Sequence, residues 1–190
     1  MQALILDGSY QGDHSLDGVR QIVMDELAQR QWAAQAIRLS DLHIRHCLGC
    51  FGCWIKMPGV CIIKDEGRDV ARGVVQSDLV VLLTPVTFGG YSSELKKAVD
   101  RYACSTLLPF FVKVNGEFHH PARYPRRPRL VGVGMLPEPD PESERIFTTL
   151  VERNAINFHS PTHAARVTIP SDIPTLRSDI RALFSTVGVG

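Results

Sequence analysis

The chain begins with MQALILDGSYQGDHSLDGVRQIVMDEL (residues 1–27), in which two regular patterns are joined by a polar turn. Met1–Leu6 is short and mostly apolar without helical spacing, which predicts a buried strand. Gly8 and Gly12 lie in the polar turn that follows. From Leu16 onward, apolar residues recur every three or four positions, which predicts an amphipathic helix. The chain therefore opens as a strand, a glycine-containing turn and a helix.

The turn between this strand and this helix is a candidate anion site. Backbone N–H groups at the beginning of a helix, together with the hydroxyls of Ser9 and Ser15, favour a bound phosphate. The glycine spacing matches neither the dinucleotide-binding fingerprint nor the loop of nucleoside triphosphatases. The alternative is a simple turn in which Ser15 caps the helix. The residues by themselves leave both interpretations open.

Further strand and helix patterns follow along the chain. The strand patterns cover Ala34–Leu39, Leu79–Leu83, Leu130–Leu136 and Arg166–Ile169, and the helical patterns cover Glu94–Arg101, a segment starting at Asp140-Pro141 and a segment opening near Pro174. Five strands alternating with helices predict an α/β fold with a parallel sheet covered on both faces. Ligands of such sheets bind outside the carboxyl ends of the strands. We therefore expect a ligand site among the loops 8–15, 40–63, 85–93 and 136–140.

Length and composition narrow the class of protein. The 190 residues predict one domain, 1–190, with an inserted loop at about 102–128. The 21 basic and 20 acidic side chains give a net charge of +1, which argues against nucleic-acid binding. No apolar run is long enough for a membrane span, and the first residues lack the basic flank of a signal peptide. We therefore expect a cytoplasmic protein with no membrane partner.

Four of the five cysteines lie within fifteen residues of one another. They are Cys47, Cys50, Cys53 and Cys61, and an odd total in a chain of this class does not suggest a disulfide framework. Four thiolates are enough for a [4Fe–4S] cluster. Zinc fits less well, because its structural sites use two separated Cys or His pairs. The third alternative is that these thiols hold no metal. The fifth cysteine, Cys104, is expected to be a small buried side chain.

Three segments in combination resemble one protein family. They are Leu6–Leu16, the cysteine-containing segment Cys47–Asp65, and Thr84–Arg101 with its Pro-x-x-Phe-Gly and Lys-x3-Asp-Arg motifs. Together they resemble the flavodoxin-like NADPH-dependent FMN reductases, including their cysteine-rich branch and the related iron–sulfur flavoproteins. The resemblance covers about residues 1–105. It implies a flavodoxin-like three-layer sandwich with a five-stranded parallel sheet.

The resemblance also implies an FMN site made of two loops. The phosphate loop of the family falls on Gly8, Ser9, His14, Ser15 and Leu16, and its isoalloxazine loop falls on Pro85, Val86, Thr87, Phe88 and Gly89. In this interpretation Tyr91 flanks the flavin ring, and Phe51 and Trp54 line either the flavin pocket or a subunit contact. The chemistry takes place at flavin N5, so no catalytic side chain is named.

The implied activity is an FMN-dependent NAD(P)H oxidoreductase. Electrons pass from reduced nicotinamide through the flavin to a small acceptor, such as a quinone, a flavin, a nitro compound or a metal ion. The family implies a homodimer or higher homo-oligomer. The alternative is an iron–sulfur flavoprotein or flavodoxin-like electron carrier, with a cluster at Cys47, Cys50, Cys53 and Cys61 close to the flavin. A third possibility is a binding or sensor protein that keeps the fold without the activity.

One basic stretch has no counterpart that the resemblance explains. Residues 118–129 hold four arginines and two histidines among three prolines, which predicts an irregular surface loop. Its arginines Arg123, Arg126, Arg127 and Arg129 either bind the 2′-phosphate of NADPH, since guanidinium groups suit phosphate, or are simply solvated.

Overall fold

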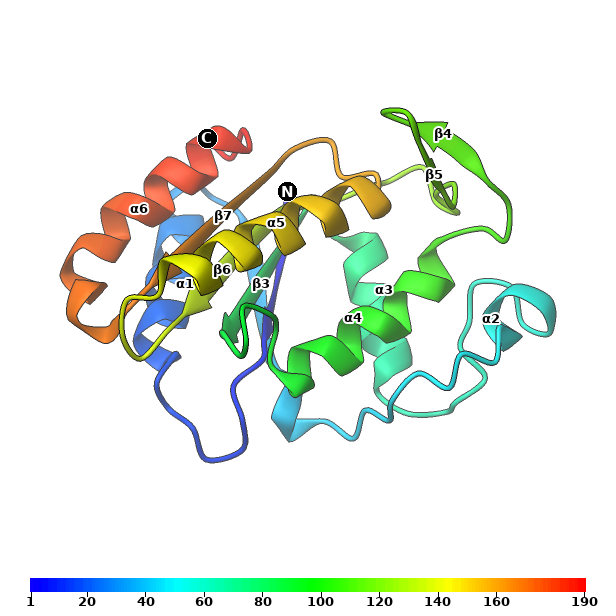
Figure 1. Ribbon diagram of the computed structural model, residues 1–190, viewed down its shortest axis with the longest axis horizontal. Helices are drawn as coiled ribbons and strands as arrows, with labels where there is room; N and C mark the ends of the chain where they lie inside the picture. The colour runs from blue at the N-terminus through cyan, green and yellow to red at the C-terminus, as the bar shows by residue number, and fades with distance from the viewer.

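Five parallel strands form the central sheet of the protein, with helices covering both faces (Figure 1). The structure, a computed structural model, describes residues 1–190. The strands of the sheet are β1 (Gln2–Asp7), β2 (Ala33–Arg38), β3 (Leu79–Pro85), β6 (Arg129–Met135) and β7 (His163–Thr168). The helices are α1 (Asp17–Gln29), α2 (Gly52–Ile55), α3 (Gly67–Gln76), α4 (Ser93–Thr106), α5 (Pro141–Asn157) and α6 (Ile173–Thr186). Two short 3₁₀ turns, η1 (Leu39–Asp41) and η2 (Pro170–Asp172), follow β2 and β7.

The sheet order is β2-β1-β3-β6-β7, and every neighbouring pair is parallel. The chain moves outward from β1 to one edge, returns to β3 beside β1, and then moves to the other edge. The order thus reverses between β1 and β3, which is where open α/β sheets bind their ligands. The predicted flavodoxin-like α/β sandwich is confirmed, because five parallel strands lie between two helical layers.

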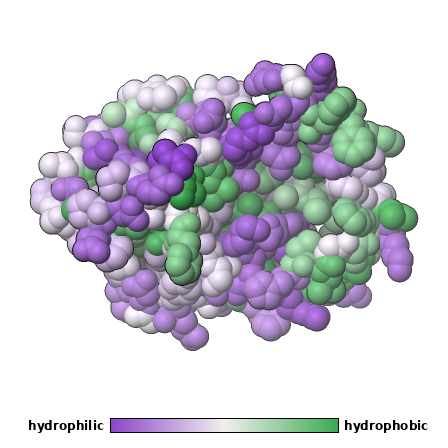
Figure 2. All heavy atoms as spheres, viewed as in Figure 1, coloured by the Kyte–Doolittle hydropathy of each residue, from purple (hydrophilic) through white to green (hydrophobic).

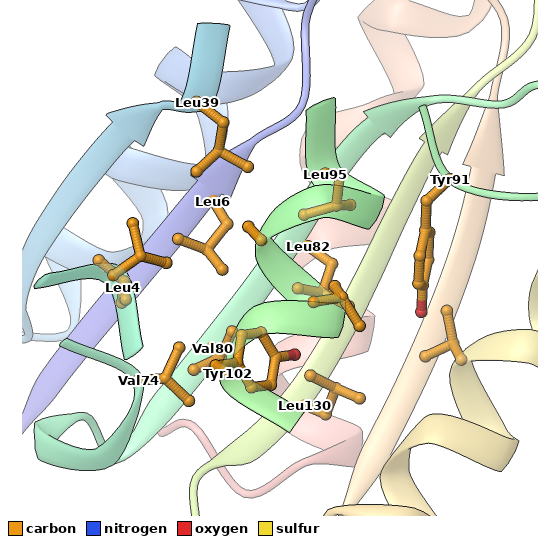
Figure 3. Packing of buried hydrophobic residues seen from close by; sticks show 14 of the residues in the cluster. Leu4, Leu6, Leu39, Val74, Val80, Leu82, Tyr91, Leu95, Tyr102 and Leu130 are labelled. Atoms are coloured by element: carbon orange, nitrogen blue, oxygen red, sulfur yellow. The ribbon is translucent and has the colours of Figure 1, made fainter. Parts of the chain in front are cut away.

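Two apolar cores, one on each face, explain why the strands read as unbroken apolar runs. Successive side chains of a strand point to opposite faces. Along β3, Val80 and Leu82 pack under α3, α4 and α5, whereas Val81 and Leu83 pack under α1 and α6. Figure 3 shows the first of these cores, in which Tyr102 of α4 lies beside Val80. Neither face of this sheet is exposed to water, so its strands lack an alternation of apolar and polar residues.

Two helix termini show how local sequence sets the element boundaries. The Asp140 carboxylate accepts hydrogen bonds from the N–H groups of Glu142 and Ser143, and Pro141 occupies the first turn of α5. This is the predicted cap, and it is confirmed. At α1, by contrast, Leu16 is the N-cap residue and no side chain caps the helix. None of the six helices is both long enough and apolar enough to cross a bilayer.

The structure contains elements that the sequence patterns did not predict. Helix α3 was missed because only Val70 and Val74 mark its buried face. In the predicted inserted loop, the chain forms an antiparallel hairpin of β4 (Val112–Val114) and β5 (Glu117–His119). The basic stretch 118–129 is therefore part strand and not wholly irregular. Strand β7 also begins three residues earlier than its apolar pattern suggested.

Candidate functional site

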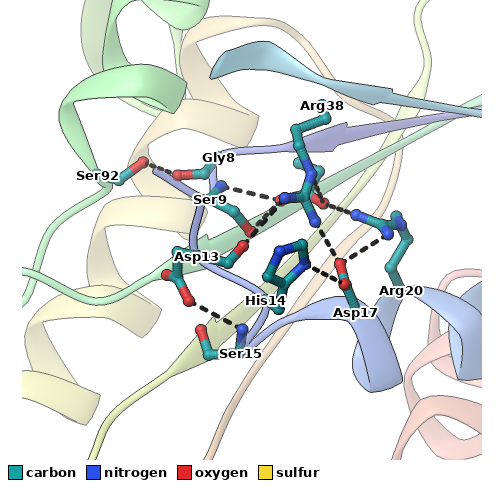
Figure 4. A network of polar contacts seen from close by, with 10 residues as sticks. Gly8, Ser9, Asp13, His14, Ser15, Asp17, Arg20, Arg38 and Ser92 are labelled. Atoms are coloured by element: carbon teal, nitrogen blue, oxygen red, sulfur yellow. Dashed lines mark hydrogen bonds and ion pairs between the residues drawn. The ribbon is translucent and has the colours of Figure 1, made fainter. Parts of the chain in front are cut away.

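The loops that follow β1 and β3 are fastened to each other at the carboxyl edge of the sheet. Gly8 N–H donates to the Leu83 carbonyl at 2.8 Å, and the Ser92 hydroxyl donates to the Gly8 carbonyl at 2.6 Å. Ser92 N–H in turn donates to the Thr84 hydroxyl at 2.9 Å. A Cβ on Gly8 would lie 2.7 Å from Leu95 Cβ and from Ser92 Oγ, so only glycine permits this approach. Figure 4 shows the Ser92–Gly8 contact beside the first loop.

The first loop presents unpaired backbone donors at the beginning of α1. The N–H groups of Tyr10, Gln11, Gly12, His14 and Leu16 donate to no group of the chain. Gly12 has a φ of +76°, a left-handed conformation that turns the backbone at no steric cost. Free N–H groups at the positive end of a 13-residue helix form an environment suited to an anion.

Most polar side chains in and around this loop form hydrogen bonds or ion pairs with one another. The buried Asp7 carboxylate accepts from Ser9 N–H at 2.9 Å and from the Ser9 hydroxyl at 2.6 Å. Arg20 pairs with both Asp7 and Asp17, and Arg38 also pairs with Asp17 (Figure 4). Since both arginines are neutralised by carboxylates, an anion at this loop relies on backbone N–H groups. The Ser9 hydroxyl points into the protein.

The negative charge of the Asp13 carboxylate disfavours an anion at this loop. Its carboxylate accepts from Ser15 N–H at 2.9 Å, and no cationic side chain pairs with it. Ser15 does not cap α1, so that alternative is wrong: Asp13 holds its N–H instead. His14 is largely exposed and lies 2.8 Å from Asp17, and a hydrogen bond from His14 lowers the pKa of Asp17. The loop thus combines free N–H donors with one uncompensated carboxylate.

The loop after β3 is a two-residue turn that projects into solvent. Thr87 and Gly90 exchange backbone hydrogen bonds of 3.0 and 2.9 Å. Phe88 and Gly89 between them have φ values of 49° and 74°, the signature of a type I′ turn. Phe88 at the tip is 98% exposed, whereas a Cβ on Gly89 would lie 2.6 Å from Ile146 of α5. The N–H groups of Phe88 and Gly89 have no partner in the chain.

Two residues of this loop belong to the core. Val86 is buried, and its N–H donates to the Met135 carbonyl of β6. Tyr91 is also buried; its hydroxyl accepts from Asn154 at 2.9 Å and its ring lies edge-on to Phe147. Burial raises the pKa of Tyr91 to about 12. The expectation that Tyr91 flanks a flavin ring is wrong, because its ring is used in packing against α5.

The ten residues predicted to hold FMN therefore differ in accessibility. His14, Ser15, Thr87 and Phe88 are exposed, Pro85 is half-buried, and Gly8, Ser9, Leu16, Val86 and Gly89 are buried. Leu16 is a core side chain, so only its N–H can face a ligand. Sequence reasoning missed Ser92 and Thr84, which join the two loops. The preference of serine for a helix N-cap is the signal that could have found Ser92.

The cysteines lie in and around α2, at the other end of α4. Cys53 is buried, Cys50 is exposed, and Cys47, Cys61 and Cys104 are half-buried. Burial, together with the neighbouring thiols, raises the pKa of Cys53. No three Cys, His, Asp or Glu side chains of the protein are placed so that they could hold a metal ion. As arranged here, the thiols form no metal site.

The cysteines and the two loops contact opposite ends of α4, so the length of this helix sets the distance between them. Trp54 Nε1 of α2 donates to the Cys104 carbonyl at 2.6 Å, whereas Ser92 at the other end of the helix contacts Gly8. Twelve residues separate Ser92 and Cys104, which is about 18 Å of helix. Within one chain, α2 therefore lies far from Gly8, so a cluster held at α2 would not be close to a flavin held by the two loops of the same chain.

The basic stretch is remote from the loops as well. Arg123 donates to the Ser105 and Leu107 carbonyls, and Arg126 pairs with Asp78, just before the first residue of β3. Arg129 lies over the Trp32 ring at 5.8 Å. Arg126 and Arg129 lie at the amino ends of β3 and β6, opposite the candidate loops, and Arg123 lies against the carboxyl end of α4. Arg123 and Arg126 are thus engaged within the chain, and the interpretation that this stretch binds the 2′-phosphate of NADPH stays a prediction.

The comparison with known protein families matches the amino-terminal part of the chain, which contains the segments that resemble the FMN reductases. The sequence pattern of the NADPH-dependent FMN reductases matches residues 1–121, which include both loops and α4. The chain belongs to the NADPH-dependent FMN reductase family. In this family member, the matched region ends just after the β4–β5 hairpin.

Curated relatives of this reductase-family chain are iron–sulfur flavoproteins. One from Methanocaldococcus jannaschii is 28% identical over 101 residues, 53% of this chain and 51% of the relative. One from Archaeoglobus fulgidus is 29% identical over 101 residues, 53% of this chain and 48% of the relative. The chain spans about half the length of these relatives.

Solved structures confirm the fold of this family member. An NAD(P)H:quinone oxidoreductase from Methanothermobacter marburgensis superposes with a TM-score of 0.72, at 9% identity, over 96% of this chain and 94% of the other. An FMN-dependent NADH-azoreductase from Bacillus anthracis, in complex with FMN, gives 0.63, at 10% identity, over 97% and 98%. At such identities the likeness concerns the fold alone.

Proposed function

We propose that the protein is an FMN-dependent oxidoreductase that passes electrons from NADH or NADPH to a small acceptor. The observation that carries this proposal is the pair of loops at the switch point of the sheet. They are joined through Ser92 and Gly8, and both expose unpaired backbone N–H groups. Membership in the NADPH-dependent FMN reductase family supports the same cofactor.

The donor set of the two loops fits FMN. The N–H groups of Gly12, His14 and Leu16 would hold the phosphate at the positive end of α1. The N–H groups of Phe88 and Gly89 would donate to the polar edge of the flavin ring. The exposed Phe88 ring offers an apolar surface beside that edge. A flavin needs both features, namely directed donors and an apolar wall.

The protein would contribute orientation instead of an acid or a base. When bound, the flavin supplies two-electron exchange with a nicotinamide and with a second substrate. Residues 85–91 contain no titratable side chain other than the buried Tyr91, whose hydroxyl is already bonded to Asn154. The short turn between Thr87 and Gly90 holds its two free N–H groups in fixed directions. This rigidity would preorganise the donors around the ring.

The test is a binding and turnover experiment on the full chain. FMN fluorescence is titrated with wild type, with Ser15→Glu in the first loop, and with Ser178→Glu, which alters another exposed serine, on α6. We expect Ser15→Glu alone to weaken FMN binding at least about tenfold, because it adds a negative charge where the phosphate lies. NADH and NADPH oxidation at catalytic flavin levels is then measured. Wild type that binds no FMN contradicts the proposal.

A second candidate function is that of an iron–sulfur flavoprotein that carries single electrons. The observation favouring it is that the curated relatives bear this name and that the chain has four cysteines within residues 47–61. Iron and acid-labile sulfide are assayed in protein purified without oxygen. Four of each per chain, lost in Cys50→Ser and Cys53→Ser, support this candidate. Flavin alone, with no iron or sulfide, contradicts it.

A further inference from the structure

A cavity lies beneath the basic stretch, at the end of the sheet opposite the flavin loops. We call it the amino-end cavity, because Val80 and Leu130, near the amino ends of β3 and β6, form part of its lining. Val74 of α3 and Phe158 after α5 add to the apolar lining, and residues 122–128 form the outer wall. The cavity holds about 470 Å³ of empty space, its open mouth included, which is within the range of small-molecule sites.

The outer wall of the amino-end cavity is anchored to the body at both of its ends. Arg123 N–H donates to the Thr106 carbonyl at 2.9 Å, just after the last turn of α4. At the other end, the Ser160 hydroxyl donates to the Pro128 carbonyl at 2.9 Å. Pro125 restricts the backbone between these anchors. Because the wall is already ordered, a ligand would bind without the entropic cost of ordering it.

Tyr102 of α4 contributes a buried hydroxyl that has no partner in the chain. The side chain is 2% exposed, its ring centroid lies 5.0 Å from that of Phe158, and its hydroxyl makes no hydrogen bond. Figure 3 shows the hydroxyl on the side of Leu130, which lines the same cavity. Burial raises the pKa of Tyr102, so the hydroxyl keeps its proton and can donate it to an acceptor. Buried hydroxyls are rarely left unpaired, so this one points to an oxygen atom of a ligand.

The mouth of the amino-end cavity carries a cation that no carboxylate neutralises. Arg127 is exposed, lines the cavity, and forms no ion pair or hydrogen bond within the chain. The neighbouring Arg126, by contrast, pairs with Asp78 and donates to the Gln76 carbonyl. A free guanidinium group suits a carboxylate, to which it can donate two parallel hydrogen bonds. The cavity thus combines a cation at its mouth, an apolar lining and a hydroxyl donor inside.

We propose that the amino-end cavity binds a small aromatic carboxylate that carries an oxygen atom on the ring, opposite its carboxylate group. The ring lies among the apolar side chains, the ring oxygen accepts from the Tyr102 hydroxyl, and the carboxylate pairs with Arg127. The narrow interior favours a flat ring over a bulky group. An alkyl chain would leave the Tyr102 hydroxyl unpaired. The site is separate from the flavin loops and does not depend on the proposed function.

The test is a calorimetric titration of the full chain with 4-hydroxybenzoate as the probe. FMN is present in excess, so that the flavin loops are not open to the probe. Benzoate lacks the ring oxygen, and 4-hydroxybenzamide lacks the negative charge. We expect 4-hydroxybenzoate to bind at least about tenfold more tightly than either analogue, because each analogue loses one of the two polar contacts.

Two variants with matched controls assign the contacts. Tyr102→Phe should make the affinities for benzoate and 4-hydroxybenzoate about equal, whereas Tyr91→Phe removes a buried hydroxyl outside the cavity and should leave the preference unchanged. Arg127→Gln should weaken binding of 4-hydroxybenzoate at least about fivefold, whereas Arg45→Gln, which alters another exposed arginine, should not. Circular dichroism checks that each variant folds.

Four outcomes overturn the proposal. The first is that 4-hydroxybenzoate at millimolar concentration gives no binding heat. The second is a tenfold preference for 4-hydroxybenzoate that survives in Tyr102→Phe, since the hydroxyl then does not contact the probe. The third is an equal loss in Arg127→Gln and Arg45→Gln. The fourth is binding that occurs only without FMN, which places the probe at the flavin loops.

The variants also distinguish the cavity from a nonspecific apolar surface. Figure 2 shows apolar atoms exposed at the end of the molecule that Figure 1 labels α2, β4 and β5. A probe bound there would respond neither to Tyr102→Phe nor to Arg127→Gln, because neither side chain belongs to α2 or the hairpin. Binding that is unchanged in both variants therefore overturns the proposal as well.

Discussion

The buried ion pair between Asp65 and Arg101 is the contact whose loss should most disturb the cysteine segment. The two side chains are 3% and 1% exposed, and both Arg101 terminal nitrogens donate to the carboxylate, at 2.7 and 2.8 Å. Arg101 also donates to the Arg45 carbonyl, while Asp65 accepts from the N–H groups of Arg45 and Gly67. The pair therefore joins both ends of segment 45–65 to α4.

Substitution Arg101→Met keeps most of the side-chain volume and leaves the Asp65 carboxylate buried without its cation. Breaking a buried pair in this way costs about 3–5 kcal/mol. For a chain of this length, that lowers the melting temperature by roughly 6–20 °C. Lys96→Met on the same helix is the matched control, because Lys96 and Asp100 form an exposed pair worth less than about 1 kcal/mol.

The pH dependence provides a second readout. Burial by itself raises the pKa of Asp65, but hydrogen bonds from Arg101 and from Arg45 N–H outweigh it, so the pKa is lowered overall. A carboxyl group with a lowered pKa stabilises the fold above its unfolded pKa, and this contribution is lost as the pH falls toward the folded value. In Arg101→Met the unpaired carboxyl is protonated more easily. The stability difference between wild type and the variant should therefore shrink in acid.

Thermal and urea unfolding at neutral and acidic pH measure both effects, and a thiol reagent reports on the buried Cys53. We expect Cys53 to react faster in Arg101→Met, because the segment that covers it is released. A melting temperature no lower than that of Lys96→Met would refute the reasoning. A stability difference that stays constant down to acidic pH would also refute it.

Three further changes test other parts of the structure. Asp13→Asn keeps an acceptor for Ser15 N–H but removes the charge, and FMN affinity should rise about fivefold (~1 kcal/mol) with riboflavin affinity unchanged, as fluorescence titration shows. Equal gains for both flavins would contradict this. Glu26 on α1 is fully buried among three arginines, which lower its pKa from 4.5 to about 2. Glu26→Gln should therefore cost about 1–2 kcal/mol in urea unfolding at neutral pH, and the loss should fade between pH 4.5 and about 2. A Cβ on Gly134 would lie 2.6 Å from Val86, so Gly134→Ala should cost about 1–3 kcal/mol in thermal unfolding, whereas Gly18→Ala, with nothing nearby, should cost nothing.

Much of the fold could be predicted from short-range patterns. The apolar runs at β1, β3 and β6 identify strands covered on both faces, and Asp140-Pro141 identifies the beginning of α5. These features depend on neighbours within one element. Helix α3 and the β4–β5 hairpin escaped prediction because both are short and bury few apolar residues, so each offers few apolar positions from which a pattern can be recognised.

The candidate site divides in the same way. Its position at the carboxyl ends of β1 and β3 follows from the strand–turn–helix pattern and from the family resemblance. The burial and the bonding partners of its side chains do not follow from the sequence. Tyr91 looked suited to a flavin ring, yet contacts with Phe147 and Asn154 place it in the core. The arginines of 123–129 looked suited to a phosphate, yet Arg123 donates to carbonyls at the end of α4 and Arg126 pairs with Asp78 before β3.

By itself, the sequence determined the α/β class, the parallel sheet, the family and the two loops, because each of them can be recognised from residues close together along the chain. Only the tertiary structure decided which donors in those loops remain free, which carboxylates neutralise Arg20 and Arg38, and how far the cysteines lie from Gly8. Those facts depend on contacts between residues far apart in sequence. Burial and ion pairing, which set the charge and the access of a site, exist only once such residues meet.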